Sequence, residues 1–171
     1  PGWRVIQHAG GTLRENALTD HIGRGEEDQG QHDAPRDCPY VTGAAFAMRR
    51  KVLEEVGLLD ERYLPAYFEE TDLCFRVRRR GYRVVYEPGA RLVHHEGTAS
   101  GGTQSERFLY NYHKNRLRFV LRQYSPRAFL RRFVPAEIAW MRAFMPPEQK
   151  KPLARAYAVN ALRLPLTLLG Y

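Results

Sequence analysis

Residues 67–81 read YFEETDLCFRVRRRG, and their pattern predicts the local structure of the middle of the chain. Leu73 and Val77 recur at helical spacing, arginines fill the other side, and Gly81 is a typical residue for ending a helix. We therefore predict a helix over residues 67–80. Such a helix begins with a dense group of carboxylates, which are candidate functional residues.

Glu69, Glu70 and Asp72 lie at or just before the start of this helix. Three carboxylates within four residues repel one another unless the helix dipole, backbone N–H groups or a bound cation offset the repulsion. Crowding and partial burial also raise the pKa of a carboxyl group, which suits a general base. The alternative is a capping cluster, in which one carboxylate caps the helix and the others are solvated.

Shorter patterns on both sides predict alternating strands and helices around this segment. Extended segments are expected at 3–7, 40–48, 83–86 and 91–94, helices at 49–56 and 105–124, and a long loop at 16–39. The run at 40–48 is apolar and predicts a buried strand. The rest of the chain is expected to be divided into short helices by its prolines, which are Pro126, Pro135, Pro146, Pro147, Pro152 and Pro165.

Composition excludes several classes of protein. With 43% hydrophobic residues in a chain of 171, a packed core can form, which argues against global disorder. Cys38 and Cys74 are far apart in the sequence, so they form neither a disulfide scaffold nor a CxxC metal site. A reducing compartment fits best, with a single disulfide bridge as the alternative. No apolar run approaches the roughly 18–20 residues of a membrane span. The first residue is Pro1 rather than methionine, which indicates a piece of a longer protein.

The formal net charge of +8 is unevenly distributed along the chain. Residues 1–100 hold 14 Lys/Arg and 16 Asp/Glu, whereas residues 101–171 hold 13 Lys/Arg and 3 Asp/Glu. The basic segment predicts either a solvated helical surface or docking onto an anionic membrane. A nucleic-acid-binding module is the rival interpretation. No helix-turn-helix, zinc-finger or single-strand-binding signature accompanies the charge, so no nucleic-acid partner is expected.

His94 and His95 follow Pro88 at the end of an extended segment. Histidines bind divalent metals and titrate near neutral pH, so this pair is a candidate metal ligand. A metal site needs further ligands, and none is visible at a fixed local spacing. A pair of exposed loop histidines is therefore the competing interpretation.

These segments form a continuous pattern of short motifs. In order, the motifs are 43–50 (GAAFAMRR), 57–63 (GLLDERY), 67–76 (YFEETDLCFR), 80–82 (RGY), Pro88 and the two histidines, with 7–11 (QHAGG) before them and 115–119 (NRLRF) after them. The pattern resembles the C-terminal half of family 2 glycosyltransferases with the GT-A fold, particularly the rhamnosyltransferase-like branch. The resemblance covers about residues 3–123.

The resemblance implies an α/β fold, namely the C-terminal part of a GT-A, Rossmann-like glycosyltransferase domain followed by a basic helical tail. Residues 1–100 would form the acceptor side of the catalytic domain, 101–124 a long helix packing on it, and 125–171 a basic amphipathic helical tail. The nucleotide-binding half of the family, with its metal-binding DxD motif, is missing, and no DxD occurs in this sequence. We therefore expect residues 1–171 to be inactive alone.

The resemblance also implies roles for individual residues. Glu70 stands at the position of the general base that takes the proton of the acceptor hydroxyl, where many relatives carry aspartate. Glu69 and Asp72 would support the start of the helix and orient the acceptor. Gly43 and Ala44 would line the acceptor or sugar pocket, where a small residue lets a substrate approach the backbone.

A divalent metal, Mg or Mn, is implied as cofactor, bound mainly by the missing half. His94, six residues after Pro88, is the expected ligand, with His95 as the alternative. The implied reaction is the inverting transfer of a sugar from a nucleotide-sugar donor to a saccharide or lipid-linked acceptor in cell-envelope polysaccharide synthesis. The expected location is cytoplasmic, and peripheral on the inner face of the membrane if the tail binds lipid. A non-catalytic scaffold of the same fold is the remaining alternative.

Overall fold

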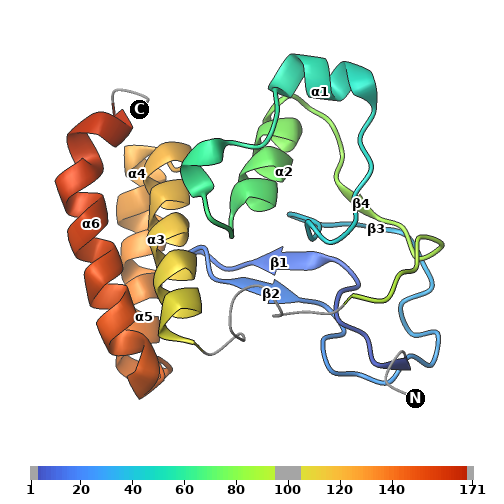
Figure 1. Cartoon of the computed structure of the whole chain (residues 1–171), viewed down its shortest axis with the longest axis horizontal. Coiled ribbons are helices and arrows are strands. Elements are labelled where there is room, and N and C mark those ends of the chain that lie inside the picture. The colour runs from blue at the N-terminus through green and yellow to red at the C-terminus, as the bar shows by residue number, and fades with distance from the viewer. Residues whose placement is uncertain (1–3, 95–104, 169–171) are drawn as a thin grey trace. The chain divides into compact units, whose positions relative to one another are not determined.

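The computed structural model describes residues 4–94 and 105–168, which fall into two compact units (Figure 1). The first unit contains the described residues up to Leu13, Thr19–Arg62 and Glu69–His94. The second unit contains Arg14–Leu18, Tyr63–Phe68 and the described residues from 105 onward. Each unit has buried apolar side chains of its own.

The first unit contains two small antiparallel sheets. Strand β1 (Gly11–Leu13) pairs with β2 (Thr19–His21), and β3 (Arg36–Asp37) pairs with β4 (Val85–Tyr86). Strands of two or three residues form few ladder hydrogen bonds. These sheets therefore depend on the side chains packed against them.

Two helices stand between β3 and β4 in the chain, α1 (Arg50–Val56) and α2 (Glu69–Arg79), with the 3-10 turn η2 (Glu61–Tyr63) between them. Helix α1 ends where Gly57 adopts a φ of 79°, a left-handed conformation that glycine takes without steric cost. Its N–H donates to the oxygen of Leu53 at 2.8 Å. Helix α2 carries acidic residues in its first turn and arginines in its last, so both ends complement the helix dipole.

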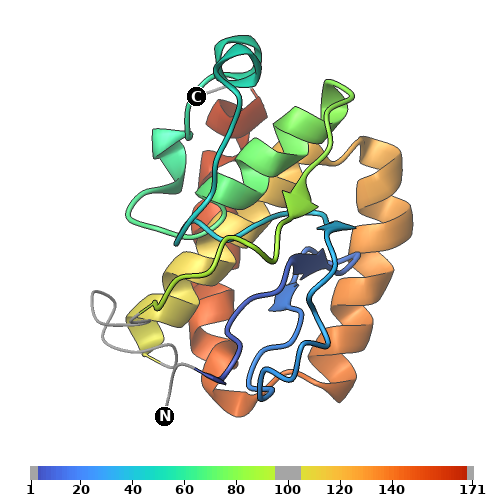
Figure 2. The ribbon, with the colours of Figure 1, turned by 90° about the vertical axis from the view of Figure 1, so that its right-hand side faces the viewer.

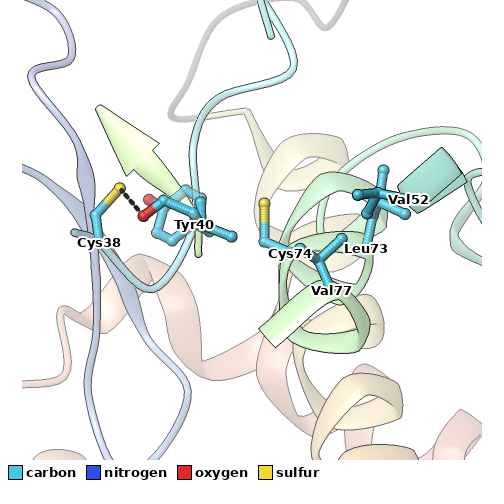
Figure 3. Packing of buried hydrophobic residues seen from close by; sticks show 7 residues of the cluster. Cys38, Tyr40, Val52, Leu73, Cys74 and Val77 are labelled. Atoms are coloured by element: carbon cyan, nitrogen blue, oxygen red, sulfur yellow. Dashed lines mark hydrogen bonds between the residues drawn. The ribbon is translucent and has the colours of Figure 1, made fainter. Parts of the chain in front are cut away.

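The core of the first unit combines side chains of α1 and α2 with residues that flank β3 and β4 (Figure 3). Its buried members are Cys38, Tyr40, Val52, Leu73, Cys74, Val77 and Val84. Leu73 and Val77, predicted as the apolar face of the helix, both belong to this cluster. Burying one such aliphatic side chain stabilises the fold by about 1.5–3 kcal/mol, so the cluster fixes α2 against α1.

Helices α3 (Glu106–Gln123) and α6 (Lys150–Leu168) pack side by side in the second unit (Figure 1). Helix α3 begins at Ser105, whose hydroxyl accepts the N–H of Phe108 at 3.1 Å and so supplies the N-cap. Both helices contribute buried apolar side chains, which include Leu109, Leu117, Leu153 and Ala156.

A continuous helical run lies between α3 and α6 in the chain, in orange in Figure 2. It consists of α4 (Pro126–Ala128), the π-helical turn η3 (Phe129–Phe133) and α5 (Val134–Ala143). The hydroxyl of Ser125 accepts a backbone N–H of α4 at 3.2 Å and caps the start of the run. The 3-10 turn η4 (Pro147–Gln149) leads into α6.

A buried ion pair joins α3 to α5. The guanidinium of Arg116 donates to both carboxylate oxygens of Glu137, at 2.6 and 2.8 Å, and both side chains are almost fully buried. Arg116 also donates to the backbone oxygen of Asn16 at 2.6 Å, and the hydroxyl of Tyr157 on α6 donates to Glu137 at 2.8 Å. Burial alone would raise the pKa of Glu137, but the hydrogen bonds and charge of Arg116 outweigh burial and lower it.

The loop before α2 is held by Asn115, a fully buried residue of α3. Its Nδ2 donates to the backbone oxygens of Tyr63, of Ala66 at 2.8 Å and of Tyr67 at 3.0 Å. Tyr67 and Phe68 adopt φ angles of 79° and 75°, a left-handed conformation that costs aromatic residues energy. The three carbonyls that converge on one amide nitrogen hold this strained loop in place.

The predicted helices are confirmed, whereas the predicted strands are mostly wrong. Helices α1, α2 and α3 begin and end within two residues of the predicted bounds. Residues 40–48, predicted as a buried strand, contain no strand, and 43–47 are exposed. Within 4–7 only an isolated bridge between Val5 and Glu27 is present. The expected loop at 16–39 contains β2 and β3, while the strand expected at 83–86 is present as β4.

The prolines divide the C-terminal segment only in part as predicted. Pro126 begins α4, and Pro147 begins the turn η4 that separates α5 from α6. Pro135 lies at the start of α5 within the continuous helical run, and Pro152 and Pro165 lie within α6. Pro152 stands in the first turn of α6, where a missing N–H costs no hydrogen bond inside the helix. The domain boundaries expected near 100 and 124 stay a prediction. The mixture of helices and small sheets is compatible with part of a GT-A domain.

Candidate active site

The start of α2 carries the carboxylates that the sequence singled out. Tyr67 and Phe68 are left-handed and cannot continue a helix, so α2 begins at Glu69. Glu70 and Asp72 then fall in the first turn, where unpaired backbone N–H groups and the helix dipole favour negative charge. Part of the expected repulsion among the three carboxylates is offset in this way.

Asp72 is committed to the fold. Its carboxylate is buried and accepts a hydrogen bond from Nε of Arg76, one turn later, at 2.8 Å. Arg76 also donates to the backbone oxygen of Val56, the last residue of α1, and to that of Leu58 at 2.7 Å. Asp72 therefore helps to fix α2 to the end of α1. A direct role in orienting an acceptor stays a prediction.

Glu70 is placed differently. The residue is half-buried, and its Oε2 is buried without a hydrogen-bond partner among the residues that the structure describes. Gly43 lies against it, since a β-carbon added to this glycine would stand 3.9 Å from Cδ of Glu70. Ala44 follows in the same exposed turn, with its N–H donating to the hydroxyl of Thr42 at 3.3 Å. The structure thus places Gly43 beside Glu70, and an acceptor pocket lined by Gly43 and Ala44 stays a prediction.

The surroundings of Glu70 favour its protonated form. Burial raises the pKa of Glu70 to about 7, and the neighbouring charge of Glu69 acts in the same direction. Backbone N–H groups of Glu70 and Gly43 offset part of this effect. A carboxyl group with a pKa near neutrality exchanges a proton readily at physiological pH, which is the property that a general base needs.

The histidines do not complete a metal site within the described residues. The side chain of His94 is exposed, and its backbone oxygen accepts a hydrogen bond from Nε2 of Gln7 at 3.1 Å. His95 lies outside the residues that the structure describes. Across 4–94 and 105–168, no three or more His, Cys, Asp or Glu side chains are grouped so that they could hold a metal ion. The divalent metal stays a prediction.

A second pair of histidines, His8 and His21, had no role in the sequence-based predictions. Their Nδ1 atoms are 3.0 Å apart. The N–H of Thr42 donates to Nε2 of His8 at 3.3 Å, so that nitrogen carries no proton. Nδ1 of a neutral His8 then donates to His21. Burial, and to a smaller extent the charge of His21, lower the pKa of His8 to about 4. His8 is therefore neutral at pH 7 and fixes the loop that leads to Gly43.

The QHAGG stretch that contains His8 already belonged to the motif pattern, and this was the available signal. Its contact with Thr42 joins residues 34 positions apart in the chain. Such a contact has no spacing signature, which is why the role could not be assigned from the sequence.

No helix among the described residues is long and apolar enough to cross a membrane. The buried apolar faces of α3 and α6 pack within the second unit instead.

Comparison with known proteins gives a consistent result. A family model described as "Glycosyltransferase like family 2" matches residues 17–121. An N-acetylglucosaminyl-diphospho-decaprenol L-rhamnosyltransferase of Mycobacterium tuberculosis is 31% identical over 90 residues, which cover 53% of this chain and 29% of that protein. A galactofuranosyl glycosyltransferase of Leishmania donovani is 31% identical over 88 residues, 48% of this chain and 20% of that protein.

The O-antigen biosynthesis protein RfbC of Myxococcus xanthus is 30% identical over 101 residues, which cover 56% of this chain and 8% of that protein. The chain thus spans less than a third of the length of the curated relatives that it matches. The matched region includes α2 and the turn that carries Gly43.

Proposed function

Since this chain belongs to the glycosyltransferase-like family 2, we propose that it supplies the acceptor side of an inverting sugar transferase in which Glu70 is the general base. The observation that carries the proposal is the carboxylate of Glu70, with one oxygen buried and unpartnered among the described residues and a pKa near 7. Asp72, in the same turn, is engaged by Arg76. The assignment to Glu70 rather than to Glu69 rests on the raised pKa of Glu70 and on Gly43 beside it.

The proposed step is a direct displacement. Glu70 takes the proton of the acceptor hydroxyl, and the oxygen forms a bond to the anomeric carbon of the donor. The bond from that carbon to the diphosphate breaks, and its electron pair leaves with the nucleoside diphosphate. Because attack and departure occur on opposite sides of the carbon, the configuration inverts. Gly43 and Ala44 leave room beside the base for the acceptor.

A divalent metal, Mg or Mn, would neutralise the charge of the leaving diphosphate. The described residues offer one candidate ligand, the exposed imidazole of His94, and this is too few for a complete site. We therefore assign His94, or the next residue His95, as one ligand, with the others supplied by a nucleotide-binding half. The roles given to Glu70, Gly43 and Ala44 do not depend on this ion.

The donor is proposed to be a nucleotide sugar and the acceptor a saccharide or lipid-linked saccharide in cell-envelope polysaccharide synthesis. The names of the relatives support this class, since one is a rhamnosyltransferase named for a diphospho-decaprenol acceptor and another an O-antigen biosynthesis protein. A lipid-linked acceptor would place the enzyme on the inner face of the cell membrane.

The test is Glu70→Gln in a polypeptide that also carries the nucleotide-binding half. Loss of the base should lower kcat by about 10²–10⁴ without loss of folding, because glutamine keeps the shape of the side chain. Glu54→Gln on the exposed face of α1 is the matched control and should leave kcat unchanged. Unchanged activity of Glu70→Gln would remove Glu70 as the base.

A further inference from the structure

The outward side of residues 126–144, called here the α4–α5 outer face, carries cations and apolar side chains together. Its exposed members are Arg127, Leu130, Arg131, Arg132, Ile138, Arg142 and Phe144. Leu130 is 65% exposed, Ile138 39% and Phe144 74%. Residues 126–144 thus expose large apolar side chains and arginines along the same segment.

The opposite side of the same helical run is buried in the second unit. Phe133 and Trp140 are buried there, and Glu137 is paired with Arg116. The guanidinium of Arg116 lies 6.0 Å from the ring centroid of Phe133 and 5.5 Å from that of Trp140. The helical run is thus anchored by one side and presents the other side as a preformed surface.

The outer face also lacks compensating charge. Arg127, Arg131 and Arg142 have no carboxylate within salt-bridge distance among the described residues, and the acidic residue of this run, Glu137, is buried on the other side. In contrast, Arg155 on α6 pairs with Glu106 at 2.9 Å. The positive charge of this face is therefore available to an external anion.

We propose that the α4–α5 outer face binds the surface of an anionic lipid membrane. The arginines would contact lipid phosphates, and Leu130, Ile138 and Phe144 would enter the boundary between headgroups and acyl chains. The exposed apolar side chains near the arginines favour lipid over nucleic acid. They can enter the acyl-chain boundary of a membrane, whereas the phosphates of a nucleic acid attract only the arginines. The link between membrane binding and a lipid-linked acceptor rests on the proposed function. Binding of the chain to lipid, however, can be measured without any sugar transfer.

Co-sedimentation of the full chain with vesicles tests the proposal. Vesicles of phosphatidylcholine with about one third phosphatidylglycerol should bind the chain, and vesicles of phosphatidylcholine alone should bind it far less. The variant Arg127→Gln, Arg131→Gln, Arg142→Gln should lose about a hundredfold in affinity, roughly fivefold for each arginine. The control Lys51→Gln, Arg80→Gln, Arg107→Gln removes the same charge from exposed positions elsewhere and should lose less than threefold.

A second variant, Leu130→Ser with Phe144→Ser, separates lipid insertion from simple charge attraction. It should weaken binding to anionic vesicles about tenfold and leave the thermal unfolding of the chain unchanged, since both side chains are exposed. Equal losses in the arginine variant and its control would overturn the proposal. The proposal would also be overturned if the serine variant bound the vesicles fully and RNA displaced the chain from them. Those two results together identify a surface that recognises phosphates alone.

Discussion

Neighbouring carboxylates on α2 differ in what their surroundings allow them to do. Asp72 is neutralised by Arg76, one helical turn away, whereas Glu70 has a buried oxygen without a partner among the described residues. The spacing of Asp72 and Arg76 is visible in the sequence, but the carbonyls of Val56 and Leu58 that hold Arg76 are not. The residue pattern alone therefore locates the acidic turn, whereas the roles of its three carboxylates follow from the family resemblance and stay predictions.

Glu70→Gln should also change how the stability of the chain depends on pH. The pKa of Glu70 rises from 4.5 to about 7 in the folded state, so the folded chain loses stability as the pH increases through this range. Glutamine has no charge to bury, so the variant should be more stable than the wild type at pH 8, by roughly 1–3 kcal/mol, and similar at pH 5. Chemical denaturation at both values measures this, and equal stabilities at pH 8 contradict it.

Asn115 should be among the most sensitive residues of the second unit. Asn115→Ala leaves three backbone oxygens without the amide that they share, and we expect a loss of roughly 1–3 kcal/mol. Asn115→Asp keeps the size but turns an oxygen toward the same carbonyls, so it should cost more than alanine. Urea denaturation ranks the two variants, and an aspartate variant as stable as the wild type would contradict the role given to the amide.

At the scale of elements, helices were predictable because their signals are local. The N-cap at Ser105, the spacing of Leu73 and Val77 and the terminal glycine of α1 all act within a few residues. Strands two or three residues long carry no periodic signal, and their pairing depends on distant residues. The run at 40–48 is rich in small apolar residues, and this composition does not distinguish a buried strand from an exposed turn.

The pair between Arg116 and Glu137 should be the strongest single link between α3 and α5. Glu137→Gln leaves a buried guanidinium without its counter-charge and should cost about 3–5 kcal/mol. Replacing both partners, by Arg116→Met with Glu137→Leu, should recover much of that loss. Glu106→Gln, which breaks an exposed pair with Arg155, is the matched control and should cost less than about 1 kcal/mol. A double variant no more stable than Glu137→Gln would contradict this account.

At the scale of the whole molecule, length is the dominant fact. The chain spans less than a third of its curated relatives and contains no DxD sequence. We predict that residues 1–171 alone do not transfer sugar, because the contacts to the donor belong to the nucleotide-binding half. Assays with nucleotide-sugar donors should give no more product than the Glu70→Gln form of the same chain. Sugar transfer by residues 1–171 well above that of the Glu70→Gln form would refute this prediction.

The two cysteines of the chain, Cys38 and Cys74, are both buried in the core of the first unit, and the second unit contains none. Burial raises the pKa of both thiols, that of Cys74 to about 11, so neither is reactive while this core is closed. The rate at which these thiols are alkylated therefore reports the unfolding of the first unit, which contains Glu70. Unfolding of the second unit alone does not change this rate.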